Sequence, residues 1–147
     1  MTTARIATLR AELRDDTTFV ATPRPRLSWT VQTDENAWEQ ASAELRAGEE
    51  SVTLDGRDSV LVAWPFAELA AGEVRDVSVR VRSAGGTWTD WSAPLAVTAG
   101  FLAEGEWIAQ PIGLADAARE AQPALVRTTF TIGKPVRQAT LLWTALG

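Results

Sequence analysis

The side chains able to do chemistry are few in kind, because the 147-residue chain contains no His and no Cys. A Ser-His-Asp or Cys-His nucleophile, a thiol redox pair and a zinc site with the usual nitrogen and sulfur ligands are therefore excluded. Carboxylates, arginines, hydroxyls and the single Lys134 remain. No phosphate-binding glycine loop or metal-ligand spacing occurs, so we assign no catalytic, cofactor-binding or metal-binding residue.

Neighbouring carboxylates need a separate test, because two acids suffice for the hydrolysis of a glycosidic bond. Three pairs occur, namely Asp15 with Asp16, Glu49 with Glu50, and Asp55 with Asp58. All three lie in polar, turn-like stretches without the apolar surroundings that raise the pKa of a carboxyl group. We interpret them as solvated turn residues.

The most specific local pattern combines two arginines with two tryptophans. Residues 77–82 alternate between valine and polar residues, so a strand there places Arg80 and Arg82 on the face opposite the valines. Trp88 and Trp91, three residues apart, lie on one side only if their segment is extended with three residues per turn. We predict that Arg80, Arg82, Trp88 and Trp91 form a structural Arg–Trp ladder. The alternative is an exposed aromatic platform that binds sugar or a partner protein.

Short alternating segments separated by turn residues must position this pattern, and they predict antiparallel β-structure. The segments are residues 27–32, 41–46, 60–64, 77–82 and 95–97, preceded by a less regular edge strand over residues 6–13. Roughly seven strands in about 100 residues are typical of a β-sandwich. We therefore expect an all-β antiparallel sandwich over residues 1–100.

Residues 101–147 are expected to form a linker and the incomplete start of a second β-domain. Two strand-like runs, 125–132 and 136–144, follow a loop, but two or three strands cannot close a sandwich of their own. Their apolar side chains, such as Val126, Phe130 and Leu141, are therefore expected to pack against another surface.

Charge and hydropathy exclude two classes of partner. The net charge of −5 does not suit a general nucleic-acid-binding surface. No stretch of about 18 apolar residues occurs, and Met1–Arg5 has no apolar signal core. We expect no nucleic-acid partner, no membrane partner and a cytoplasmic location.

Four features in order resemble a fibronectin type III domain: Leu69-x-x-Gly72, the strand 77–82, a Gly-rich turn and Trp91-Ser-Ala-Pro94. The corner tyrosine of such folds is replaced by Arg75, which leaves the corner hydrogen bond without its usual donor. The sequence Trp88–Ser92 also resembles the Trp-Ser-x-Trp-Ser box of cytokine-receptor domains.

A longer series of short segments runs through nearly the whole chain. The segments are Thr22–Trp29, Asp58–Val62, Val79–Val81, Asp90–Pro94, Thr98–Leu102, Glu106–Ile108, Pro123–Phe130, Lys134–Val136 and Thr144–Gly147. Together they resemble the N-terminal region of bacterial α-L-rhamnosidases of glycoside hydrolase family 78. The resemblance implies a fibronectin-III or immunoglobulin-like sandwich followed by the first strands of a second, truncated β-sandwich.

The resemblance also implies a function. In that family an (α/α)6 barrel further along the chain hydrolyses terminal α-L-rhamnose from rhamnosides with inversion, and none of its catalytic positions lies in these residues. This chain would be a non-catalytic accessory region without enzyme activity or cofactor of its own. Its partners would be the downstream catalytic domain of the same parent chain and a rhamnoside carbohydrate. The alternatives are a carbohydrate-binding module that uses exposed tryptophans and a fibronectin-III-type protein-interaction domain.

Overall fold

The structure is a computed structural model, and it describes residues 4–13, 19–112, 125–137 and 139–143. Six strands form within these residues: β1 (Arg5–Ala11), β2 (Leu27–Gln32), β3 (Gln40–Ala47), β4 (Glu50–Asp55), β5 (Val74–Ser83) and β6 (Leu95–Thr98). Over the described ranges the chain forms no helix, and hence no helix that could cross a membrane. The prediction of an all-β antiparallel fold is confirmed.

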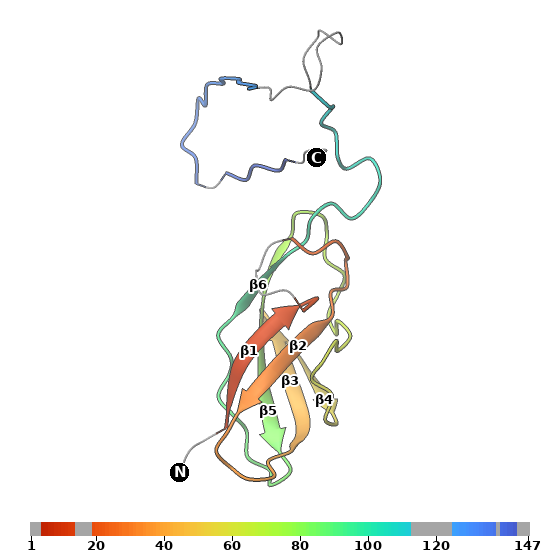
Figure 1. The fold of residues 1–147 in the computed structure, drawn as a ribbon, viewed down its shortest axis with the longest axis vertical. Helices are drawn as coiled ribbons and strands as arrows, with labels where there is room; N and C mark the ends of the chain where they lie inside the picture. The colour runs from red at the N-terminus through yellow and green to blue at the C-terminus, as the bar shows by residue number, and fades with distance from the viewer. Residues whose placement is uncertain (1–3, 14–18, 113–124, 138, 144–147) are drawn as a thin grey trace. The chain divides into compact units, whose positions relative to one another are not determined.

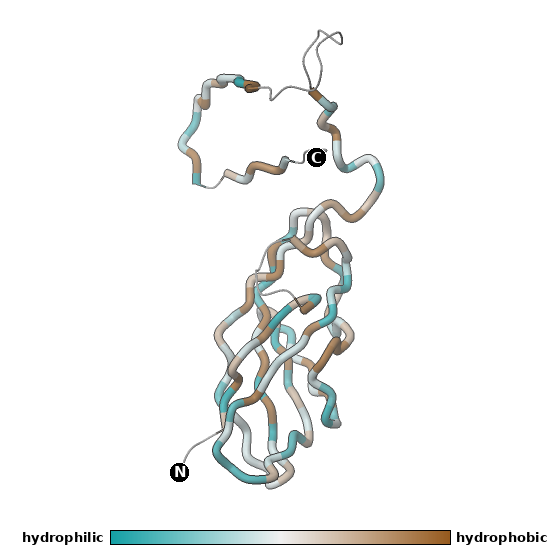
Figure 2. Tube along the Cα trace, in the orientation of Figure 1, coloured by the Kyte–Doolittle hydropathy of each residue, from teal (hydrophilic) through white to brown (hydrophobic). Residues whose placement is uncertain are grey.

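The chain divides into two units, residues 1–108 and 109–147, and all six strands belong to the first. Two antiparallel sheets form the first unit, with β1–β2 lying in front of a four-stranded sheet of order β4-β3-β5-β6 (Figure 1). The β3–β4 hairpin closes where Ala47 pairs with Glu50, and Gly48 adopts the positive φ of 60° that this tight turn requires. The turn after β2 is hydrophilic, as Figure 2 shows.

Alternation along the strands decides which side chains fill the space between the sheets. Val77, Val79 and Val81 of β5 are each 0% exposed, and Leu45 of β3 lies directly opposite Val79. Trp29 of β2 meets them from the other sheet and is 2% exposed. Each fully buried aliphatic or aromatic side chain contributes about 1.5–3 kcal/mol, so this layer provides the main stabilisation of the sandwich.

A short chain of hydrogen bonds holds the central tryptophan in place. Trp29 Nε1 donates to Gln40 Oε1 at 3.0 Å, and both side chains are buried. Gln40 Nε2 donates in turn to the carbonyl oxygens of Gly56 and Asp58, each at 3.2 Å. The loop after β4 is therefore tied to the core through one buried amide whose polar groups are satisfied.

The segment expected to form a strand over residues 60–64 pairs differently. Leu27 and Val62 exchange both backbone hydrogen bonds at 2.8 Å, but this is an isolated bridge and not a strand. Leu61 has a φ of 52°, which interrupts the extended backbone that a continuous ladder needs. The predicted strand is wrong, because Leu61 interrupts the backbone between the Trp29–Ser59 hydrogen bond and the Leu27–Val62 pair.

Arg75 makes the corner hydrogen bond that its replacement of tyrosine had put in question. Its Nη1 donates to the carbonyl oxygen of Ala67 at 3.1 Å, and the same oxygen accepts from Trp64 Nε1 at 2.8 Å. An ion pair with Glu73 holds the guanidinium, while the Glu73 carboxylate accepts the N–H of Ala70 at 2.8 Å. The corner is thus kept with a different donor.

The second unit has no strand within its described residues, 109–112, 125–137 and 139–143. This differs from the strands expected over 125–132 and 136–144, because an alternating sequence becomes a strand only when a ladder partner is present. Hydrophobic residues recur along this unit, as the brown segments of Figure 2 show. Val126, Phe130 and Leu141 are 61%, 81% and 84% exposed, so the burial expected for them is not found.

Candidate functional site

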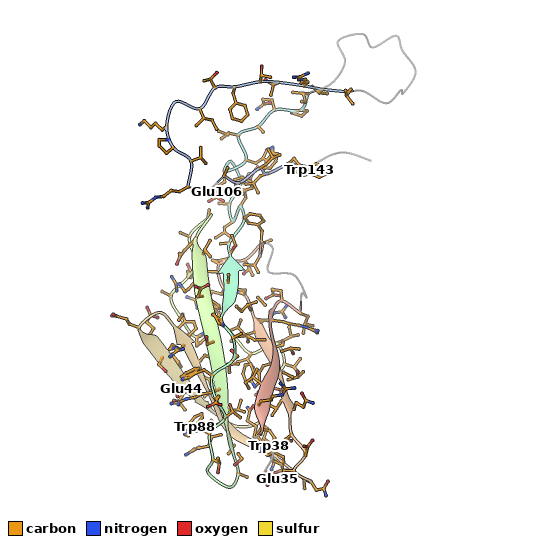
Figure 3. All side chains as sticks on the ribbon, turned by 90° about the vertical axis from the view of Figure 1, so that its left-hand side faces the viewer. Glu35, Trp38, Glu44, Trp88, Glu106 and Trp143 are labelled. Atoms are coloured by element: carbon orange, nitrogen blue, oxygen red, sulfur yellow. The ribbon has the colours of Figure 1, made fainter. Side chains whose placement is uncertain are left out.

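The outer face of the four-stranded sheet carries the residues that the sequence had singled out. Because Val79 and Val81 of β5 point into the core, Arg80 and Arg82 point outward, and both are partly buried by their neighbours. Trp88 lies on this outer side of the sheet, away from β1, as Figure 3 shows.

Residues 87–92 run beside β5 without forming a regular strand. The N–H of Thr89 donates to the carbonyl of Val81 at 2.9 Å, and Thr89 Oγ1 accepts the N–H of Val81 at 3.1 Å. Ser92 repeats both contacts with Val79, at 2.8 and 3.0 Å. A hydroxyl oxygen therefore replaces a backbone carbonyl as the acceptor, and the paired residues recur every three positions instead of every two.

This three-residue period brings the two tryptophans to one side of their segment. The guanidinium carbon of Arg80 lies 4.8 Å from the ring centroid of Trp88 and 4.7 Å from that of Trp91. The guanidinium carbon of Arg82 lies 5.5 Å from the Trp88 centroid. All three distances are within the reach of about 6 Å for a cation–π contact. The structure thus brings Arg80, Arg82, Trp88 and Trp91 together.

Arg46 of β3 is a fifth member, which the sequence analysis did not identify. Its guanidinium carbon lies 4.3 Å from the Trp91 centroid. Each indole is therefore contacted by two guanidiniums, and the stack runs Arg82, Trp88, Arg80, Trp91, Arg46. We use the name Arg–Trp ladder for these five residues. The outward position of Arg46 follows from the burial of its neighbours on β3, but its register against β5 is not visible in sequence.

Two polar side chains of β3 hold the ladder arginines of β5 through hydrogen bonds. Glu44 lies opposite Arg80, and its Oε2 accepts from Arg80 Nε at 2.6 Å and from Nη2 at 2.5 Å. Ser42 lies opposite Arg82 and its Oγ accepts from Arg82 Nε at 3.1 Å. Figure 3 shows Glu44 on the same side of the sheet as Trp88. These contacts orient the guanidinium planes toward the indoles.

The electrostatics of the ladder keep Glu44 ionised. The hydrogen bond from Ser51 Oγ, at 2.6 Å, and then the hydrogen bond and charge of Arg80 hold the pKa of Glu44 below its ordinary value of 4.5. A carboxylate with a lowered pKa is a poor general acid at neutral pH, because it carries no proton to give.

The carboxyl groups with shifted pKa values, Glu12, Glu44 and Glu73, are all shifted downward, which does not suit a general acid for glycoside hydrolysis. An inverting enzyme needs two carboxyl groups about 6.5–9.5 Å apart, one of them with a raised pKa. The carboxyl group that forms an ion pair with the ladder is that of Glu44. Glu49, Glu50, Asp55 and Asp58 are exposed as predicted, but Glu50 and Asp55 are the end residues of β4 and not turn residues. The pair at positions 15–16 lies outside the described residues. Within the described ranges no three potential ligands gather as a metal site.

A small cleft lies between one edge of β1 and the chain that leads into β6. Residues 6–9 and 92–95 line it, and its volume is about 200 Å³. Pockets for small ligands usually measure about 300–1,000 Å³, so this cleft is small for a sugar site. It contains no charged side chain, and none of the five ladder residues lines it.

Three other tryptophans lie away from the ladder. Trp64 is 6% exposed and packs edge-to-face on Phe66 in the core of the first unit, with ring centroids 5.3 Å apart. Trp107 is 40% exposed and makes the same kind of contact with Phe101, also at 5.3 Å. Trp38 is partly buried against the core. None of the three forms a sugar-stacking platform with the ladder.

Comparison with known families identifies the sandwich. The family model described as "Rha78A-like, N-terminal immunoglobulin domain" matches residues 6–103, which extend from β1 to beyond β6. No curated protein matches the chain.

Similar solved structures are much longer proteins. The native α-L-rhamnosidase from Aspergillus terreus is 28% identical, with a TM-score of 0.65 over 71% of this chain and 13% of its own. The Streptomyces avermitilis α-L-rhamnosidase complexed with L-rhamnose is 24% identical, with a TM-score of 0.67 over 72% of this chain and 11% of its own. The enzyme from Dictyoglumus thermophilum is 15% identical, with a TM-score of 0.63 over 69% and 13%. This chain therefore spans about an eighth of the length of these structures, and the last two support the fold alone.

Proposed function

Because the chain belongs to the Rha78A-like N-terminal immunoglobulin domain family, we propose that it serves as the non-catalytic accessory region of an α-L-rhamnosidase. The observation that carries the proposal is the family match, which includes the sandwich from β1 through β6. The similarity to the Aspergillus terreus α-L-rhamnosidase supports the same assignment.

The proposed parent enzyme removes terminal α-L-rhamnose from rhamnosides with inversion. Such a reaction needs a general acid and a general base on either side of a water molecule. Hydrogen bonds hold the pKa values of Glu12, Glu44 and Glu73 below the ordinary value, which is the opposite of what a general acid needs and supports a location of the acids elsewhere in the parent chain. The partner of this sandwich is then the catalytic domain of the same polypeptide.

The accessory role is structural support, and the contacts of the tryptophans argue for it against sugar binding. A sugar stacks on the open face of an aromatic ring, but two guanidiniums contact each indole of the ladder. Arg80 and Arg82 are two residues apart on one strand face, about 6.6 Å, so Trp88 within reach of both lies between them. A carbohydrate-binding module would need those ring faces free.

The test is to express the full reading frame to which this chain belongs, together with a version that begins after residue 108. We expect the full protein to hydrolyse an aryl α-L-rhamnoside. The shortened version should keep the KM for that substrate and lose thermal stability, because a support domain acts on folding and not on the substrate.

Two outcomes would contradict the proposal. Absence of rhamnosidase activity in the full protein would remove the family assignment of the parent. A shortened version with unchanged thermal stability and a KM raised about tenfold or more, equivalent to about 1.4 kcal/mol of substrate binding, would favour a carbohydrate-binding module instead.

A further inference from the structure

The three arginines of the Arg–Trp ladder carry more positive charge than the neighbouring carboxylate of Glu44 can neutralise. Arg80 forms an ion pair with Glu44, whereas no carboxylate of the described residues lies within ion-pair distance of Arg46 or Arg82. Arg82 gives its Nε–H to Ser42 and retains its two terminal amino groups. Two guanidiniums with unused donors therefore lie on the outer face of a chain whose net charge is −5.

The strand register fixes the spacing of these two cations. Arg46 lies opposite Ser78 in the β3–β5 ladder, and Arg82 follows Ser78 by four residues along β5. At about 3.3 Å per residue, the two positions are about 13 Å apart along the strand direction. An extended polypeptide with acidic residues at positions i and i+4 presents two carboxylates on one side at the same spacing.

The unpaired polar groups of the ladder itself are hydrogen-bond donors, while the exposed Asp76 of β5 lies on the same face near the Arg46 end. The indole N–H groups of Trp88 and Trp91 make no hydrogen bond within the described residues, and the terminal amino groups of Arg46 and Arg82 point to the same outer side of the sheet. Guanidiniums recognise carboxylates through two parallel hydrogen bonds. The indole faces are already in contact with arginines, so a carboxylate fits this surface better than a sugar ring.

We propose that the outer face of the β4-β3-β5-β6 sheet binds an extended acidic segment of a protein, with one carboxylate on Arg46 and another on Arg82. The inference goes beyond the accessory role and does not depend on the activity of a parent enzyme. Asp55 of β4 borders this site across Ser42 and is exposed, so it opposes binding at the Arg82 end.

The experiment titrates the 147-residue chain with three short serine–threonine peptides and follows the indole N–H signals of Trp88 and Trp91 by NMR. The first peptide has two glutamates four residues apart, the second has the same two glutamates side by side, and the third has glutamines in their place. We expect the first peptide to bind most tightly. Its affinity should fall when the ionic strength rises from about 0.01 M to about 1 M, because the Debye length then shrinks from about 30 Å to about 3 Å.

Variants locate the contact. Arg46→Gln and Arg82→Gln should each weaken binding of the first peptide about two- to fivefold, as the loss of one exposed ion pair predicts. Asp55→Asn should strengthen it, because a like charge is removed. The matched control is Arg5→Gln on β1 of the other sheet, where the guanidinium bonds only the neutral side chain of Gln32 among the described residues, and binding should not change.

Several results would overturn the proposal. Equal binding of the first two peptides would remove the spacing argument, and an equal effect of Arg5→Gln would indicate attraction to the whole chain and not to the ladder. Tighter binding of a galacturonate trisaccharide than of any peptide would replace the protein segment with an acidic glycan. If the Gln variants do not fold, the affinities of the three peptides for the unmodified chain still test the proposal.

Discussion

At the scale of single residues, Arg80 is the centre of the outer face. Its guanidinium contacts the indoles of Trp88 and Trp91 and is held from β3 by Glu44. Cation–π contacts of partly buried pairs contribute about 0.5–2 kcal/mol each, and the aliphatic part of an arginine adds apolar contact. These contributions are large against the total stability of about 5–15 kcal/mol expected for a domain.

Substituting Trp91 by alanine should therefore destabilise the sandwich. The change removes the contacts with both Arg46 and Arg80, and we expect the free energy of unfolding to fall by about 1–2 kcal/mol. Urea denaturation measures the loss, with Ile108→Ala as a control of an 86% exposed side chain that should change stability by less than about 0.5 kcal/mol. Unaltered stability in Trp91→Ala would show that the ladder is not structural.

The acid stability of the protein should depend on Glu44. Its pKa is lowered in the folded state, so its contribution is fully present above the unfolded value of 4.5 and is lost as the pH falls through the folded pKa. Glu44→Gln should lower the free energy of unfolding at neutral pH and flatten its decrease on acidification. Ser51→Ala, which removes the main cause of the shift, should show part of the effect.

Urea denaturation across the acid range measures that pH dependence. Glu12 also has a lowered pKa, through its contact with Arg26, and lies directly after β1 of the other sheet. Glu12→Gln should therefore act independently, and the double variant should show the sum of both changes. A Glu44→Gln variant with the same acid slope as the unmodified protein would refute the role given to this carboxylate.

The corner residue gives a third test. Arg75→Met removes one of the two donors to the carbonyl of Ala67, since Trp64 Nε1 remains, and leaves Glu73 without its ion-pair partner, so we expect a loss of about 0.5–1.5 kcal/mol. Arg75→Tyr should lose less than Arg75→Met, because a tyrosine hydroxyl can donate to the same carbonyl. Thermal unfolding ranks the three proteins, and an equal loss in both variants would show that the corner hydrogen bond contributes nothing.

At the scale of elements, the sheet is completed by a segment that is not a strand. Residues 87–92 supply hydroxyl acceptors for two backbone N–H groups of β5. Ser92 Oγ accepts the N–H of Val79, and Thr89 Oγ1 accepts that of Val81. A buried N–H without an acceptor costs about 1–3 kcal/mol, so these two hydroxyls are necessary to the register of the segment.

Ser92→Ala should therefore expose one amide and not the other. We expect the exchange of the Val79 amide hydrogen to accelerate, because its acceptor is removed, while the Val81 amide retains its bond to Thr89. Ser92→Thr keeps a hydroxyl and should restore the protection of Val79. Hydrogen exchange followed by NMR resolves both amides in one sample, and equal acceleration at both would mean that the whole segment had detached.

Local pattern allowed part of these elements to be predicted. Period-two alternation placed β2, β3, β5 and β6 and the outward direction of Arg80 and Arg82, because each strand has one buried face. The same alternation does not predict β4, although Val52 and Leu54 alternate with polar residues, and it predicts a strand where Val62 makes only a bridge. Neither Arg46 nor Glu44 could be joined to the ladder from sequence, since strand pairing brings together residues 36 positions apart, as in the Arg80–Glu44 contact.

At the scale of the whole molecule, the chain consists of a two-sheet sandwich and a second unit whose described residues have no strands. The family match lies in the first unit, and the rhamnosidases of similar structure are far longer than this chain. The fold could be predicted from sequence because many short strands with turns between them allow few architectures. The exposure of Val126, Phe130 and Leu141 could not be predicted from sequence, since an apolar pattern does not indicate whether a partner strand exists.

The central claim is that this chain supports an α-L-rhamnosidase without doing its chemistry. The most direct measurement is an assay of the purified 147-residue chain with 4-nitrophenyl α-L-rhamnopyranoside, with a rhamnosidase as positive control. We predict no release of nitrophenolate above the enzyme-free rate, because the pKa values of Glu12, Glu44 and Glu73 are lowered whereas inverting hydrolysis needs a carboxyl group with a raised pKa. Turnover that is abolished by substituting an aspartate or glutamate of this chain would contradict it.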